Sequence, residues 1–106
     1  MIISTCDDVP GYRIDKSLGL ARGNTIRARH LGRDITAGIK GLFGGEIGDY
    51  TKLMAESREQ AIDRMIAHAE SLGADGIVGV RIGTSMVMQL AAEIVAYGTA
   101  VRLTQE

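Results

Sequence analysis

Apolar side chains recur at helical spacing between residues 49 and 72, and this is the clearest pattern in the chain. The positions on this face are Tyr50, Leu53, Met54, Ala61, Ile62, Met65, Ile66, Ala69 and Leu72. Asp49 can cap the first turn, because its carboxylate accepts from amides that have no partner within the helix. Gly73 can end the last turn in a left-handed conformation, which glycine adopts without strain. The pattern therefore predicts one long helix over residues 49–72.

Other segments have the alternation of strands. The opening stretch MIIST is typical of a short strand, and residues 12–30 predict one or two strands with a break near residues 22–24. Residues 93–103 predict a strand on which both faces are apolar or small, so we expect both faces to be covered. The stretch 86–92 fits an edge strand or a loop.

The stretch SLGADGIVGVRI, residues 71–82, places three glycines beside a β-branched run. A phosphate-binding loop runs from a strand through glycines into the N-terminus of a helix, where free amides face the anion. Here the order is reversed, so the stretch predicts the end of a helix followed by a strand. In this strand we expect Val78, Val80 and Ile82 to share one face, and Gly79 to leave room for a close-lying backbone or helix.

The glycine-rich stretch GRDITAGIKGLFGG, residues 32–45, has apolar residues at the spacing of a short helix. These residues are Ile35, Ile39 and Leu42. Gly38 and Gly41 weaken such a helix by about 1 kcal/mol each relative to Ala, so we expect it to press against a neighbour. The next residues lead into the long helix with the polarity that suits an anion. Glu46 and Asp49 already bring negative charge there, which favours a flexible connection with a self-capped helix.

Composition narrows the function classes. The chain has 106 residues, enough for one domain, with 12 Lys and Arg against 13 Asp and Glu, so it lacks the basic excess of a nucleic-acid binder. No apolar run is long enough to span a bilayer, and one cysteine excludes an internal disulfide framework, which fits the cytoplasm. The chain is 45% hydrophobic but only 4% aromatic, with 14 glycines. Part of its apolar surface is therefore expected to be buried against other copies.

Two clusters could carry chemistry. Cys6, Asp7 and Asp8 could contribute to a metal site, although zinc signatures need four ligands at familiar spacings, and a thiol beside a capped turn is the simpler interpretation. Arg29 and His30, with arginines at 27 and 33, form a basic cluster that could hold an anion or a carboxylate of a neighbouring subunit. A charged strand edge explains this cluster equally well.

Two features of the long helix have simpler explanations than catalysis. His68 lies near the apolar stripe, where we expect packing or hydrogen bonding. Glu59 and Asp63 are four residues apart and are expected to face solvent. No residue is assigned a catalytic role.

The stretch GRDITAGIKGLFGGEIGDYTKLMAESREQAIDRMIAHAESLGADGIVGVRIGTS, with VPGYRI before it and EIVAYGTAV after it, resembles the YbjQ-like proteins over nearly the whole chain. The resemblance implies an α+β subunit of β-α-β-β type, with an antiparallel sheet packed on one long helix. It also implies a ring-shaped homopentamer in which extra strands join the subunits. The family is described as "putative heavy-metal-binding", with no established function.

The family motif assigns no metal ligand to this chain. The family commonly has threonines before PGY, whereas this chain has Cys6, so Cys6 is not a family-wide ligand. The most distinctive stretch is 32–50, where the resemblance directs attention to Arg33, Asp34 and Glu46 as candidates for a shared site. With Arg29 and His30 from the basic cluster, these are the candidate ligand-binding residues.

Three functional hypotheses follow. The first is a homo-oligomeric, pentameric binding module that holds a divalent metal ion or a small anionic ligand at subunit interfaces or around a ring axis. The second is an enzyme, for example a hydrolase, with a composite site between subunits. The third is a structural ring that binds partners. In each, the principal partner is another copy of the chain, and neither a membrane nor a nucleic acid is expected.

Overall fold

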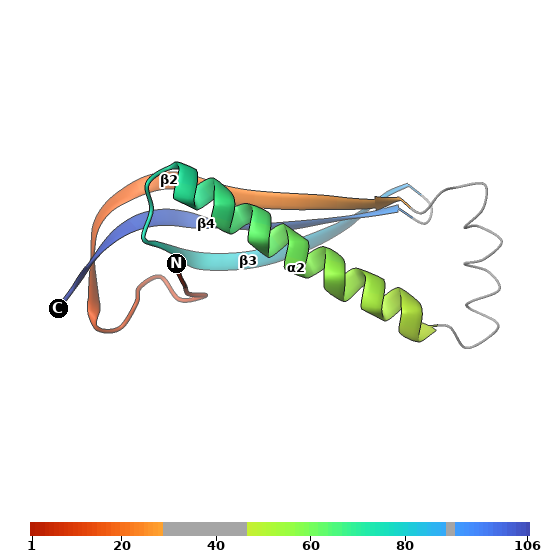
Figure 1. Ribbon diagram of the computed structural model, residues 1–106, viewed down its shortest axis with the longest axis horizontal. Helices are drawn as coiled ribbons and strands as arrows, with labels where there is room; N and C mark the ends of the chain where they lie inside the picture. The colour runs from red at the N-terminus through yellow and green to blue at the C-terminus, as the bar shows by residue number, and fades with distance from the viewer. Residues whose placement is uncertain (29–46, 89–90) are drawn as a thin grey trace.

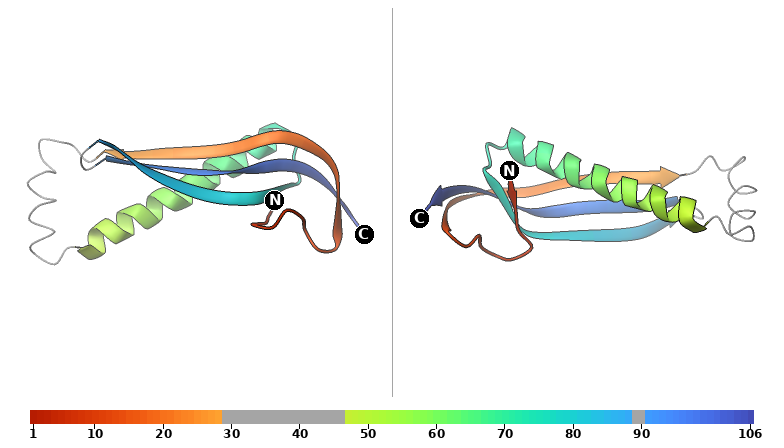
Figure 2. Two further views of the ribbon diagram at one scale, coloured as in Figure 1. Left: turned by 180° about the vertical axis from the view of Figure 1, so that it is seen from behind. Right: turned by 60° about the horizontal axis from the view of Figure 1, so that its bottom comes forward.

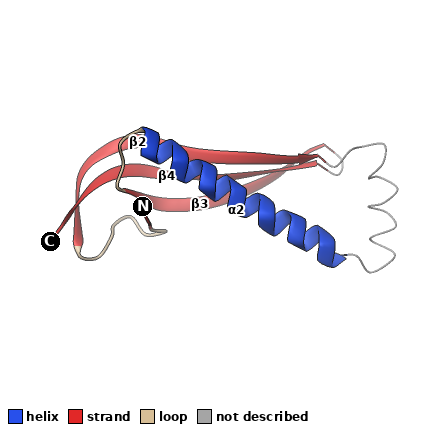
Figure 3. Ribbon diagram, viewed as in Figure 1, coloured by secondary structure: helices blue, strands red, loops and turns tan. Residues whose placement is uncertain are grey.

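The structure, a computed structural model, describes residues 1–28, 47–88 and 91–106. Its elements follow the chain in the order β1 (Ile2–Ile3), β2 (Tyr12–Ala28), α2 (Ile47–Ser71), β3 (Gly76–Met88) and β4 (Ala91–Gln105). Helix α2 lies diagonally across one face of a twisted sheet of long strands (Figures 1 and 3). The expected α+β subunit with one long helix is confirmed.

The sheet is mixed, not antiparallel as expected. The strand order is β1-β3-β4-β2, and β1 pairs with β3 in parallel while the other two pairs are antiparallel. The residues between β1 and β2 must cross β3 and β4, and Val9 packs there against Val78 and Val101. The crossing brings the chain to the far edge of the sheet, where β2 runs in the same direction as β1.

Small side chains let α2 lie directly on β2 and β4. The fully buried residues of the helix are spaced four apart, at Ser57, Ala61, Met65 and Ala69. On the sheet they meet Ala21, Ala96 and Ala100, also fully buried, and Ile94. A Cβ on Gly23 would fall on the carbonyl oxygen of Ala61 and the amide nitrogen of Met65. The backbones of helix and strand therefore approach each other at Gly23.

The end of α2 agrees with the prediction from Gly73. This residue has φ +83°, and its amide donates to the Glu70 carbonyl at 3.0 Å. The amide of Ala74 donates to the Ala69 carbonyl at 3.1 Å, which completes a Schellman motif. The start differs, because the helix begins at Ile47, two residues before the expected cap Asp49.

Strand β3 does not alternate as expected. Val80 lies in the core beneath the helix, whereas Val78 packs with Val9 and Val101, so the two valines belong to different clusters. The pairing with β4 shifts between Val78 and Arg81, and Gly79 within this bulge has φ +62°. The extra residue of a bulge moves later side chains to the other face. A Cβ on Gly79 would have a single neighbour within 4 Å, a carboxylate oxygen of Asp7 at 3.8 Å. Gly79 is therefore needed for the backbone conformation of the bulge. The close approach of a helix that we expected at Gly79 occurs instead at Gly23.

Strands β2 and β4 correct two further expectations. β2 is continuous through residues 22–24, and its irregularities lie earlier, between Ile14 and Lys16 and between Ser17 and Gly19. The uncertain stretch 86–92 belongs to the ends of β3 and β4, apart from residues 89–90, which lie outside the described residues. The expected short helix near residues 35–42 also lies outside them.

Candidate functional site

The side of the sheet that faces away from α2 is the principal candidate surface, and we call it the open face. Because side chains alternate, the residues between those that touch the helix point to this side. They are Leu20, Arg22, Asn24 and Ile26 of β2, Glu93, Val95, Tyr97 and Thr99 of β4, and Arg81, Gly83 and Ser85 of β3. Seen from behind, the strands lie in front and the helix behind them (Figure 2, left).

Among the described residues, those that cover the open face lie near the N-terminus. There Val9 closes over Val78 and Val101, and the three are almost fully buried. Farther along the same face, Leu20 is 56% exposed, Ile26 57% and Tyr97 40%. We expected both faces of β4 to be covered. Within this subunit, the face toward α2 is covered, and the opposite face is covered at one end of the strand.

A shallow depression lies in the uncovered part of the open face. Arg22 and Asn24 line it from β2, and Glu93 and Val95 line it from β4. Asn24 is directly opposite Val95, while Arg22 is opposite Tyr97 and Ile26 is opposite Glu93. A guanidinium and a carboxylate thus flank the centre of the depression, and within the described part of the chain no ion pair joins them. These four residues are not among the candidates predicted from the sequence, although the alternation in 20–26 and 93–97 was a signal for them.

Helix α2 secures the outer edge of β2 beside this depression. The Arg22 amide donates to Nδ1 of His68 at 3.1 Å, and the Arg64 guanidinium donates to the Asn24 carbonyl at 2.7 Å. Deeper in, the Thr25 hydroxyl donates to the Ser57 carbonyl at 3.2 Å. The hydrogen-bonding role expected for His68 is confirmed. These side chains occupy backbone groups that a free strand edge would leave unpaired.

The N-terminal loop that carries Cys6 is fixed to the bulge of β3. The amide of Gly79 donates to the Cys6 carbonyl at 2.8 Å, and the amide of Val80 donates to the Ser4 carbonyl at 3.0 Å. The Arg81 guanidinium donates to the Thr5 carbonyl at 2.8 Å. Cys6 itself is exposed.

The described residues of one subunit do not provide the ligands of a heavy-metal site. Among residues 1–28, 47–88 and 91–106, no three His, Cys, Asp or Glu side chains come close enough together to hold a metal ion. Nδ1 of His68 already accepts a hydrogen bond, so this nitrogen has no free lone pair for a metal. A heavy metal needs several soft or imidazole ligands, and Cys6 alone does not provide them.

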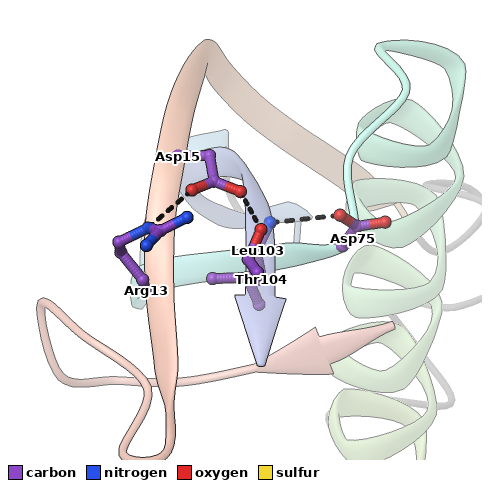
Figure 4. A network of polar contacts seen from close by, with 5 residues as sticks. All are labelled: Arg13, Asp15, Asp75, Leu103 and Thr104. Atoms are coloured by element: carbon purple, nitrogen blue, oxygen red, sulfur yellow. Dashed lines mark hydrogen bonds and ion pairs between the residues drawn. The ribbon is translucent and has the colours of Figure 1, made fainter. Parts of the chain in front are cut away.

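A polar network joins the strand ends at the N-terminal end of the sheet (Figure 4). Asp15 accepts from Nε of Arg13 at 2.9 Å and from the Thr104 hydroxyl, while Asp75 accepts from the Leu103 amide at 3.1 Å. The hydrogen bond from Thr104 and then that from Arg13 lower the pKa of the Asp15 carboxyl. A general acid needs a raised pKa, so this exposed network is structural and does not indicate acid–base chemistry.

The five residues proposed from the sequence, Arg29, His30, Arg33, Asp34 and Glu46, lie outside the described residues. Their neighbours in the chain are described. β2 ends at Ala28, which pairs with Ala91 at the start of β4, and α2 begins at Ile47. Of the other candidates, Glu59 and Asp63 are exposed on the helix as expected.

Comparisons with known proteins agree with the fold. A family model, YbjQ_1, described as "Putative heavy-metal-binding", matches residues 1–104. A UPF0145 protein of Methanosarcina acetivorans is 55% identical over 103 residues, and one of Thermotoga maritima is 52% identical, each match covering 97% of both chains. A solved structure of a protein of unknown function from the DUF74 family of Pediococcus pentosaceus has a TM-score of 0.67 over 98% of both chains, at 18% identity. This structural similarity shows the fold.

Proposed function

The chain belongs to this YbjQ-like family, and we propose that it acts as a pentameric binding module that holds a small ligand where its subunits meet. The observation that carries the proposal is the outer edge of β3. Within the described residues, the backbone of this edge has partners only as far as Val80, whose amide donates to Ser4. Beyond it, Ile82 is 42% exposed and Met86 is 78% exposed. A free edge with apolar side chains is a template for another chain.

The two edges of the sheet differ, and this difference supports a ring. Helix α2 occupies the edge of β2 at Arg22 and Asn24, and irregularities bend the same strand before residue 20. Among the described residues, no helix side chain occupies the edge of β3 after Val80, and the one register shift beyond Arg81 lies near the end of the strand, between Met86 and Met88. A contact between unlike surfaces repeats head to tail, and it closes into a ring when the rotation permits. The family resemblance supplies the number five.

The proposed ligand is a metal ion or a small anion. The described residues of one subunit do not form a metal site, so the metal part of the proposal requires ligands from more than one subunit or from residues 29–46. The proposal retains Arg29, His30, Arg33, Asp34 and Glu46 as ligand residues. No helix among the described residues is long and apolar enough to cross a membrane.

The proposal can be tested by removing one edge amide. Arg22 turns its amide toward His68, so its partner Tyr97 turns its backbone toward Arg81 of β3. The amides of Ile82, Thr84 and Met86 then alternate to the outer side. Thr84→Pro removes one outer amide and leaves the bonds to β4 in place.

We expect native mass spectra to show a pentamer for the wild type and smaller species for Thr84→Pro. Thr84→Ala, which keeps the amide, should retain the pentamer. Metal analysis of the same wild-type sample should then show whether a metal accompanies the ring in fixed proportion. A pentamer that survives Thr84→Pro would contradict the role of this edge, and a monomeric wild type would contradict the proposed assembly.

A further inference from the structure

We propose that the open faces of two copies pack against each other about a two-fold axis, with Arg22 of each copy paired to Glu93 of the partner subunit. This inference rests on the proposed function in one respect: it adds a second contact to the ring formed through β3. A two-fold contact joins copies in pairs, and it doubles a ring when its axis meets the ring axis at a right angle, which is the arrangement we propose.

The first argument is the uncovered apolar area. Leu20, Ile26 and Tyr97 point away from the helix and keep about half of their surface exposed. Val95 lies between them, half-buried, on the floor of the depression. Sheets that expose apolar side chains on one face are stabilised when a second sheet packs on that face at about 10 Å.

The second argument is that the charges of the open face complement those of the same face in a second copy. Arg22 and Glu93 both line the depression, and Glu93 is opposite Ile26, four residues along β2 from Arg22. This separation corresponds to about 13 Å along the strands. Glu93 is half-buried and Arg22 is exposed, and neither side chain has a described ion-pair partner within the subunit.

A two-fold axis across the strands, at the level of the pair Asn24 and Val95, satisfies these charges. It exchanges position 22 with position 26 on β2 and position 97 with position 93 on β4. The guanidinium of Arg22 then lies beside Glu93 of the partner subunit, and the reciprocal pair forms on the other side of the axis. Tyr97 comes opposite the same carboxylate, to which its hydroxyl can donate. The two depressions face each other on the axis.

A small ligand in the depression is the competing occupant. Sites for small molecules bury most of their ligand in a concave pocket lined mainly by apolar groups. The depression is open to solvent, and two of the four described residues that line it are charged. A partly apolar strand face that carries charges of both signs fits a second copy better.

Charge exchange tests this contact. Arg22→Glu places two carboxylates together at each pair, and Glu93→Arg places two guanidinium groups together. The double variant R22E/E93R exchanges the charges and restores both pairs. Arg58→Glu, at an exposed position of α2 away from the open face, is the matched control for the change in charge.

We expect native mass spectra and sedimentation of the wild type at micromolar concentration to show the doubled species, a decamer if the ring is a pentamer. Each single open-face variant should raise the dissociation constant of this doubling at least about tenfold, because like charges then meet twice. The double variant should recover the doubled species, and R58E should retain it. The inference is overturned if the wild type shows only an undoubled ring, if either single variant still doubles, or if the double variant does not recover. Loss of the ring itself would instead contradict the proposed function.

Discussion

The two faces of the sheet are built from the same strands but have opposite surroundings. On the helix side, Ala21, Gly23 and Ala96 are buried beneath α2, and the helix backbone rests on the strand. On the other side, the alternate residues Leu20, Arg22 and Tyr97 face outward. One alternating sequence therefore specifies two surfaces, one that stabilises the subunit and one that we propose for association.

The largest expected effect comes from making the same substitution on both faces. Gly23→Ala places a Cβ on the backbone of α2, where no side-chain rotation can relieve the clash. We expect it to lower the free energy of unfolding by about 3 kcal/mol, since overpacking of this kind forces backbone shifts.

Gly83→Ala is the matched control on the open face. There the nearest atom to the new Cβ is Cγ1 of Val95 at 3.5 Å, an ordinary contact. We expect its free energy of unfolding to change by less than about 1 kcal/mol. Chemical denaturation at one protein concentration measures both variants, and equal losses would mean that the two faces do not differ as described.

A smaller effect is expected at the end of the covering helix. Gly73 has φ +83°, and a β-branched side chain is strained in this conformation. We expect Gly73→Val to lower the free energy of unfolding by about 1–2 kcal/mol through the loss of the Schellman motif. An unchanged melting temperature would show that the helix ends elsewhere.

The smallest effect is expected at Asp15, in the exposed network outside both faces. Its hydrogen bonds with Thr104 and Arg13 lower the pKa of this carboxyl in the folded chain. The carboxylate therefore contributes stability above the unfolded pKa of about 3.9, and the contribution is lost as the pH falls through the lower folded value.

Asp15→Asn should accordingly reduce the melting temperature slightly at neutral pH and make no difference in strong acid. Thermal melts of the wild type and the variant across this range measure the change. If the difference in melting temperature between wild type and variant grew as the pH fell, it would contradict a lowered pKa of Asp15.

The features that the sequence predicted are those that local chemistry determines. The helical stripe and Gly73 placed α2 within two residues, and the alternation of 93–103 predicted a strand that lies within β4. The family resemblance supplied the α+β class.

The remaining features depend on long-range contacts. The parallel pairing of β1 with β3 and the crossing over two strands that follows it are not recorded in any local pattern. The bulge at Gly79 places Val78 and Val80 on opposite faces, and the strand break expected near Gly23 is instead the place where a continuous strand meets the helix. The depression of the open face joins residues about 70 positions apart in the chain, so the alternation of each strand alone could not bring Arg22 and Glu93 together.

Sedimentation equilibrium of the dilute wild-type protein is the decisive test of whether the surfaces that α2 leaves open serve association. We expect a mass of five or ten times that of the 11.3 kDa chain at micromolar concentration. A single species of 11.3 kDa under these conditions would contradict this expectation.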